Sequence, residues 1–190
     1  MKIGILAIQG DFALHKDALD NLSVESLYVR NISDLSNSDA LILPGGESTT
    51  ISLLLNKYNL FESIKKFAKD KSIFGTCAGS ILMSCNSDDS RVTNFGFLDV
   101  SSHRNAWGSQ IDSFSDYIDL VDDELFSEEY HATFIRAPKF SGIKKTCTIL
   151  GSYNNEPVLI RNSRHLISSF HPEISKDLCI YEYFLKMINE

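Results

Sequence analysis

Short apolar runs alternate with helical patterns through the first half of the chain. The apolar runs predict buried strands at Lys2–Ile8, Ser26–Arg30, Ala40–Leu43 and Ser72–Gly75. The segments between them predict helices at Asp11–Leu22, Ser48–Tyr58 and Leu60–Lys69, with a further helix beginning at Ala78 and running to Ser84. In the first helix, apolar residues recur at four-residue spacing and Asp11 is a candidate N-cap. This rhythm predicts a parallel sheet with helices on its faces.

The second half of the chain is richer in strand patterns. Candidate strands lie around Val100 and at Gln110–Phe114, His131–Ile135, Cys147–Tyr153, Val158–Arg161 and Leu166–Phe170. The polar, acidic stretch Ser115–Glu129 is interpreted as a loop or short helix, and Asp177–Asn189 as a closing amphipathic helix. No Pro-rich or Gly-rich linker divides the chain. We therefore predict one domain, residues 1–190, with an α/β three-layer sandwich of flavodoxin-like type: a mixed, mostly parallel sheet with helices on both faces.

Composition narrows the classes of function. The chain has 190 residues, 43% of them hydrophobic, and a formal net charge of −7. It lacks the clustered Lys and Arg that nucleic acid or an anionic membrane requires, so neither is an expected partner. The first apolar run is too short for a signal segment or a membrane span. The four cysteines show no C-x-x-C pairing, which favours a reducing, cytoplasmic compartment.

One cysteine stands in a special context. In IFGTCAGSILMS, Cys77 lies at a predicted strand–helix junction, with Gly75 and Gly79 two positions away on either side. A nucleophile elbow needs small residues at these positions because the chain turns sharply and thrusts the central side chain outward. The N-terminus of the next helix favours a thiolate. We interpret Cys77 as a nucleophile. The alternative, a buried core cysteine, is the interpretation for Cys85, Cys147 and Cys179.

A base for this nucleophile is indicated near the end of the chain. In SFHPEI, His171 follows an apolar strand, and Pro172 favours an extended backbone before it. Glu173 can then approach the imidazole and orient it. The remaining histidines are interpreted as surface or packing residues, and none forms a metal-ligand cluster with cysteines or carboxylates.

A third element, LPGGESTT, leaves the predicted strand Ala40–Leu43. Gly45 and Gly46 let the backbone approach a ligand, and Ser48 and Thr49 are candidates to cap the following helix. The exposed N–H groups suit an oxyanion or a carboxylate. The segment is not a P-loop, because it lacks Gly-Lys-Ser/Thr. A tight turn before a capped helix is an equally good interpretation of this element alone.

Together these elements resemble the triad, or class I, glutamine amidotransferases. Four stretches narrow the resemblance to the family of glutaminase subunits of pyridoxal 5′-phosphate synthases: LAIQGDFALH, PGGESTT, RNAWG and FIRAP. The resemblance spans Lys2 to Glu173. Ser80 and Trp107 depart from the residues most common in the family, but neither occupies a triad position.

The resemblance implies roles for individual residues. Cys77 is implied as the nucleophile, His171 as the base and Glu173 as its partner. Glutamine contacts are implied at Gly46, Glu47, Ser48, Arg104, Ile135 and Arg136. Backbone N–H groups of Ala78 and of the Gly45-Gly46 loop are implied as the oxyanion hole. The edge that contains Gln9, Gly10, Asp11 and His15 is the candidate interface with a synthase subunit.

The implied reaction is hydrolysis of L-glutamine, with the ammonia passed to a separate synthase subunit that makes pyridoxal 5′-phosphate. No cofactor and no metal are expected in this chain. Three alternatives stay open: a cysteine peptidase or hydrolase on a related fold, a glutaminase subunit that serves another synthase, and a module that only senses glutamine.

Overall fold

The computed structural model describes residues 1–104, 106, 113–121, 123–126 and 129–190. The helices in these residues are α1 (Phe12–Asn21), α2 (Ile32–Ser36), α3 (Ser48–Lys57), α4 (Phe61–Phe67), α5 (Ala78–Met83) and α6 (Cys179–Ile188), with a 3₁₀ turn η1 (Pro172–Ile174). The strands are β1 (Lys2–Leu6), β2 (Glu25–Val29), β3 (Ala40–Leu43), β4 (Ile73–Thr76), β5 (Ser84–Ser87), β6 (Leu98–His103), β7 (Phe114–Leu120), β8 (Glu129–Phe134), β9 (Lys139–Ser141), β10 (Thr148–Tyr153), β11 (Glu156–Arg161) and β12 (Leu166–Ser168).

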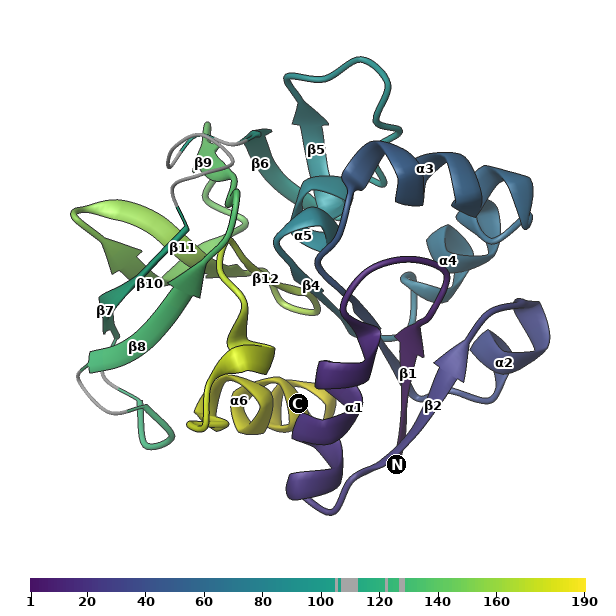
Figure 1. The fold of residues 1–190 in the computed structure, drawn as a ribbon, viewed down its shortest axis with the longest axis horizontal. Coiled ribbons are helices and arrows are strands. Elements are labelled where there is room, and N and C mark those ends of the chain that lie inside the picture. Colours follow the sequence, from purple (N-terminus) through teal and green to yellow (C-terminus); the bar gives the residue numbers. More distant parts are fainter. Residues whose placement is uncertain (105, 107–112, 122, 127–128) are drawn as a thin grey trace.

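A mixed, nine-stranded sheet forms the centre of the molecule, in the order β2-β1-β3-β4-β12-β11-β10-β7-β8 (Figure 1). The strands from β2 to β12 in this order run parallel. Those beyond β12 pair in antiparallel fashion. The parallel half comes from the β-α alternation at the start of the chain, joined by β12 from near its end. The mixed α/β sheet predicted from the sequence is confirmed.

Alternating side chains on the strands place one helical layer on each face of the sheet. On β3, Ala40 and Ile42 pack in a core cluster with residues of α1 and α6. Leu41 and Leu43 point the other way, into a cluster with residues of α2 to α5. Because both faces are covered, the strand is apolar along its whole length. The three-layer arrangement follows from this pattern (Figure 1).

The largest departure from prediction concerns the acidic stretch after residue 114. The interpretation of Ser115–Glu129 as a loop or short helix is wrong for its first part, because β7 covers Phe114–Leu120 and pairs with β8. Within β7 only Ile118 is buried, and the other residues are exposed or half-buried. Such a strand near the sheet edge carries little of the hydrophobic signal that marks buried strands. Most of the strand predicted at Gln110–Phe114 lies outside the described residues.

A second, three-stranded sheet was also not predicted as a unit. It joins β5, β6 and β9 in the order β5-β6-β9, of which only β6 was anticipated, around Val100. Its strands are short, and β5 reads Ser-Cys-Asn-Ser, which is not a strand pattern. The sheet follows α5 directly and so adjoins the loops that leave the parallel strands.

Among the described residues, no helix is both long and apolar enough to cross a bilayer.

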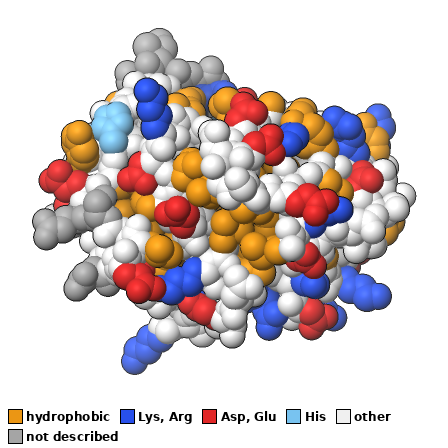
Figure 2. All heavy atoms as spheres, turned by 90° about the horizontal axis from the view of Figure 1, so that it is seen from below, with side chains coloured by type: hydrophobic (Ala, Val, Ile, Leu, Met, Phe, Trp, Pro, Cys, Tyr) orange, Lys and Arg blue, Asp and Glu red, His pale blue; other side chains and the backbone are white. Residues whose placement is uncertain are grey.

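Figure 2 views the molecule from below, the side on which α1 and the chain's N-terminus lie in Figure 1. Apolar side chains gather in the middle of this face, and acidic and basic side chains are interspersed around them (Figure 2).

Candidate active site

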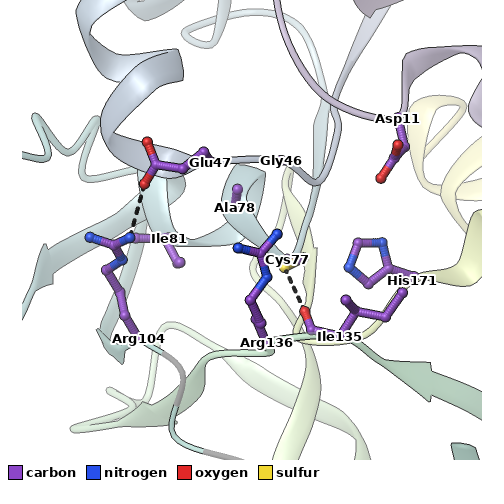
Figure 3. Close-up of a pocket in the computed structure, with 10 residues that line it drawn as sticks. All are labelled: Asp11, Gly46, Glu47, Cys77, Ala78, Ile81, Arg104, Ile135, Arg136 and His171. Atoms are coloured by element: carbon purple, nitrogen blue, oxygen red, sulfur yellow. Dashed lines mark hydrogen bonds and ion pairs between the residues drawn. The ribbon is translucent and has the colours of Figure 1, made fainter. Parts of the chain in front are cut away.

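Loops from four parallel strands meet at the carboxyl-terminal edge of the sheet. In open α/β sheets this edge is where ligands bind. β1, β3, β4 and β12 lead respectively into the segments that contain Asp11, Gly46, Cys77 and His171. A pocket at this edge is lined by Asp11, Gly46, Glu47, Cys77, Ala78, Ile81, Arg104, Ile135, Arg136 and His171 (Figure 3).

Cys77 occupies a sharp turn between β4 and α5. Its φ of 46° and ψ of −105° are unusual for a residue other than glycine. A Cβ on Gly79 would lie 1.9 Å from the Leu43 carbonyl oxygen, and one on Gly75 would lie 2.6 Å from the Met83 sulfur. The positions two residues before and two residues after Cys77 must therefore be glycine for β4 and α5 to pack so closely. This is the steric arrangement that the G-x-C-x-G pattern predicted.

The imidazole of His171 is held by Glu173 two residues later. His171 Nδ1 lies 2.7 Å from Glu173 Oε1, with both side chains almost fully buried. Burial alone lowers the pKa of His171, but its contacts with Cys77 and Glu173 outweigh that effect and raise it. Nε2 has no hydrogen-bond partner among the described residues. The ring therefore has one nitrogen fixed by a carboxylate and the other available beside the cysteine.

Glycine also brings the loop after β3 close to these side chains. A Cβ on Gly45 would lie 2.5 Å from His171 Cε1 and 3.5 Å from Cys77 Cβ, so only glycine leaves room for the imidazole. The Gly45 carbonyl accepts a hydrogen bond from the Asp11 N–H at 3.3 Å. Gln9 Oε1 accepts another from the Glu47 N–H at 2.9 Å. The polar segment after β1 thus holds the glycine loop at both of its ends.

Glu47 has two sets of partners at the start of α3. It is the N-cap, and its side chain accepts hydrogen bonds from the N–H groups of Thr49 and Thr50. Burial acts to raise the pKa of Glu47, but hydrogen bonds from the hydroxyl groups of Thr49 and Thr50, together with those from their N–H groups, lower it to about 2. Oε1 also lies 3.0 Å from Arg104 Nη2. Arg104 in turn contacts Asp89 through its other terminal nitrogen, Nη1.

Comparison with known protein families shows the family to which this chain belongs. A model described as the SNO glutamine amidotransferase family matches residues 5–190. The chain belongs to the SNO glutamine amidotransferase family. A relative in Oenococcus oeni named pyridoxal 5′-phosphate synthase subunit PdxT is 44% identical over 190 residues, which is 100% of this chain and 98% of the relative. A protein of the same name in Thermosipho africanus is 41% identical over 191 residues, with 100% of both chains covered.

A solved structure agrees with this assignment to the SNO family. The structure titled "Crystal structure of glutamine amidotransferase" superposes with a TM-score of 0.91 at 37% sequence identity and covers 99% of each chain. The fold and the family predicted from the sequence are thereby confirmed.

Most site residues anticipated in this SNO-family chain gather at the pocket. Cys77 Sγ lies 3.6 Å from the Ile135 carbonyl oxygen, and Arg136, with φ of 48°, follows at once. Figure 3 shows the Cys77 sulfur between the Arg136 guanidinium and the His171 ring. Within the RNAWG motif, residues 105, 107 and 108 lie outside the described residues.

The interpretation of Cys85 and Cys147 as buried core cysteines is wrong, because Cys85 is exposed and Cys147 is half-buried.

The structure also bears on the expectations for other individual residues. Ser48 and Thr49 do not cap α3 with their side chains, since Glu47 takes that position. Ser48 is buried and is not among the residues that line the pocket. Asp11 is the N-cap residue of α1, as predicted, although its side chain makes no capping hydrogen bond within the described part of the chain. His15 is fully buried, so its side chain is not available to a partner on the surface.

Sequence reasoning overlooked two residues at the site. Ile81 lines the pocket one helical turn after Cys77, a position that its spacing of four residues could have indicated. Asp89 contacts Arg104 from a loop that has no recognisable motif.

One potential metal-ligand atom from each of Asp11, His171 and Glu173 lies within 4.8 Å of the other two. Two of the three are already bonded to each other, and the expectation of no metal stays a prediction.

Proposed function

We propose that this chain hydrolyses L-glutamine to L-glutamate and ammonia through a Cys77–His171–Glu173 triad, and that it supplies the ammonia to a pyridoxal 5′-phosphate synthase subunit. Membership of the SNO glutamine amidotransferase family supports the reaction class. The names of the relatives, which match over nearly their whole length, support the pathway. The observation that carries the proposal is the elbow cysteine beside a carboxylate-bound histidine in one pocket.

The first step is attack of the Cys77 thiolate on the side-chain amide carbon of glutamine. A C–S bond forms, and the carbonyl oxygen takes the electron pair as an oxyanion. The Ala78 N–H at the start of α5 and an N–H of the Gly45-Gly46 loop are the proposed donors to this oxygen. The pocket includes both Gly46 and Ala78 in its lining.

The second step releases ammonia. The His171 imidazolium gives its Nε2 proton to the amide nitrogen as the C–N bond breaks, which leaves a glutamyl thioester on Cys77. Neutral His171 then takes a proton from water, and the water oxygen attacks the thioester carbon. The C–S bond breaks, glutamate leaves, and the Cys77 thiolate and the His171 imidazolium are restored. Glu173 holds the ring by its Nδ1–H and stabilises the imidazolium in both proton transfers.

Recognition of glutamine as a zwitterion falls to charged side chains at the other end of the pocket. Glu47 and Arg104 pair with each other in the structure. A substrate ammonium and carboxylate would offer each of them an opposite charge in place of this pairing. Asp89 keeps its contact with Arg104 throughout, so the guanidinium stays in place during the exchange. The Ile135-Arg136 pair, which lines the pocket, completes the proposed set of contacts.

We place the synthase on the edge that contains Gln9, Gly10 and Asp11. These residues hold the glycine loop by the two hydrogen bonds to Gly45 and Glu47. Contact at this edge would therefore act on the orientation of the Gly45-Gly46 peptide, which glycine leaves free to rotate. In this proposal the free subunit is a poor glutaminase. Its working compartment is the cytoplasm, in keeping with four free thiols, one of them exposed on Cys85.

The test is glutamine hydrolysis by the purified chain, measured alone and with the synthase encoded in the same organism. Rapid ammonia release that depends on the synthase, with ¹⁵N from amide-labelled glutamine appearing in pyridoxal 5′-phosphate, supports the proposal. Hydrolysis of peptides or esters in preference to glutamine contradicts it. Gln9→Ala tests the docking edge: the stimulation by synthase should fall, and unchanged stimulation would count against this interface.

A further inference from the structure

We propose that His15 is a positioning residue for the triad carboxylate: its Nε2–H is aimed at Glu173 and fixes the side chain that orients His171. The inference rests on the triad proposed above. His15 lies on α1, far from the triad in sequence, and its side chain is fully buried. A buried, ionisable side chain with no part in the reaction steps calls for a physical explanation.

The contacts of His15 join three elements behind the active site. Nε2 lies 3.6 Å from Glu173 Oε2 and 3.3 Å from Thr76 Oγ1. Nδ1 lies 2.7 Å from the Tyr181 hydroxyl on α6. Thr76 immediately precedes the nucleophile, so one imidazole contacts both the end of β4 and the triad carboxylate. In Figure 1, α1 and α6 lie next to each other on this side of the sheet.

Glu173 needs such a partner. Its Oε1 is hydrogen-bonded to His171, whereas its Oε2 is buried and has no hydrogen bond within 3.5 Å to any described residue. Glu173 is fully buried at its side chain, and a carboxylate oxygen left unpaired in such a place is costly. His15 Nε2, a little beyond hydrogen-bond distance, is the ring nitrogen that faces it. A small rotation of either side chain makes the bond, and that bond selects one rotamer of the carboxylate.

The chemistry of the surrounding groups determines which nitrogen of His15 carries the proton. Burial raises the pKa of Tyr181 well above its usual value, so the hydroxyl keeps its proton. In the proposed arrangement this hydroxyl donates to Nδ1, which lies 2.7 Å away. Burial is also the main reason that the pKa of His15 is lowered, so the imidazole is neutral. Its single proton is then on Nε2 and points toward Glu173 and Thr76. Glu173 thus gains a donor without a second cation that would compete with His171.

Two substitutions separate this role from simple packing. The amide of Gln reaches the position of Nε2, so His15→Gln keeps a donor toward Glu173. The amide of Asn reaches only the position of Nδ1, so His15→Asn keeps the contact with Tyr181 and loses the one to Glu173. If His15 served the fold alone, Asn and Gln would differ in stability and not in turnover.

The experiment measures glutamine hydrolysis by each variant in complex with the synthase, with thermal unfolding recorded alongside. We expect His15→Asn to lower kcat roughly tenfold to hundredfold with KM nearly unchanged, the loss typical of one hydrogen bond to a buried charge. His15→Gln should retain most of kcat. Equal losses in the two variants, or a change in unfolding temperature and KM with kcat unchanged, would overturn the proposal.

The pH dependence of kcat provides a second test, because a purely structural role of His15 would leave it unchanged. The titratable groups around the His171–Glu173 pair are Cys77, Asp11, His15, Tyr130 and Tyr181. If Glu173 is held less well, it stabilises the imidazolium less, so the alkaline limb of kcat should move to lower pH in His15→Asn. An alkaline limb that stays at the wild-type position would contradict the proposal.

Tyr181→Phe is the fallback if His15→Asn does not fold. It removes only the hydroxyl that fixes the His15 tautomer, and a fall in kcat of about threefold or more is expected. Unchanged kcat and pH profile in this variant would overturn the proposal. Failure of the triad itself is recognised separately, because Cys77→Ser would then hydrolyse glutamine as well as the wild type.

Discussion

Replacement of Glu173 by Gln tests how His171 is oriented. The wild-type carboxylate lies 2.7 Å from Nδ1, and both side chains are nearly excluded from solvent. Gln is almost the same size, but it carries no charge and can turn an N–H donor toward Nδ1. The substitution therefore removes a buried, charge-assisted hydrogen bond and allows the wrong imidazole tautomer.

The magnitude follows from these two effects. A hydrogen bond to a buried charge contributes about 1.5–3 kcal/mol, which corresponds to roughly tenfold to hundredfold in rate. A wrong tautomer raises the loss toward about 10⁴-fold, as in triads whose carboxylate is made an amide. We expect kcat to fall within the range of roughly 10²-fold to 10⁴-fold. KM should change little, because Glu173 does not line the pocket.

The assay is ammonia release by the complex, followed at several pH values. Because contact with Glu173 helps to raise the pKa of His171, its loss should lower that pKa. The imidazolium proton donor is then lost at a lower pH, so the alkaline limb of the profile should move downward. Glu182→Gln, an exposed position on α6, is the matched control and should behave as wild type. A Glu173→Gln enzyme with wild-type kcat would refute the assigned triad.

Three further predictions concern packing, pH and substrate recognition. Gly79→Ala should destabilise the fold by about 1–3 kcal/mol and lower kcat, because the new Cβ would lie 1.9 Å from the Leu43 carbonyl oxygen; denaturant unfolding that matches wild type would contradict the steric argument. His165 accepts a hydrogen bond from the Ile73 N–H, and burial lowers the pKa of its imidazole to about 4. The unfolded chain therefore binds more protons than the folded chain between about pH 6.5 and pH 4. As the pH drops across that window, the free energy of unfolding should fall by up to about 3 kcal/mol. In His165→Asn, which keeps an acceptor but does not titrate, this part of the decrease should disappear, and an identical pH dependence would show that another group is responsible. Glu47→Gln keeps an acceptor for the start of α3 but loses its charge, so KM for glutamine should rise about tenfold or more while kcat changes less; an unchanged KM would remove Glu47 from the proposed ammonium site.

The buried strands could be predicted because their environment is uniform. β3 was predicted with its observed bounds, Ala40–Leu43, since a strand covered on both faces is apolar at every position. β7 could not be predicted in this way. Its Asp116 and Asp119 point into solvent on a strand near the sheet edge, so its composition is that of a loop.

At the site, too, features set by adjacent residues could be predicted, whereas contacts between distant segments could not. The elbow around Cys77 and the His171–Glu173 pair are local, since each is set by a few adjacent residues. The contacts of Arg104 with Asp89 and of His15 with Glu173 join segments that are distant in sequence. No local pattern encodes such contacts. Sequence alone therefore predicted the elbow and the His171–Glu173 pair, but it gave His15 only as a surface or packing residue and as part of the candidate interface.

In the proposed mechanism, every step depends on the glutamyl thioester that Cys77 forms. The most direct measurement treats the complex with a glutamine-analogue electrophile and maps the adduct by mass spectrometry, with ammonia release followed in the same samples. We expect one adduct, on the peptide that contains Cys77, formed in proportion to the loss of activity and prevented by glutamine. Inactivation with the adduct on Cys85, Cys147 or Cys179, or glutamine hydrolysis that survives in Cys77→Ala, would contradict it.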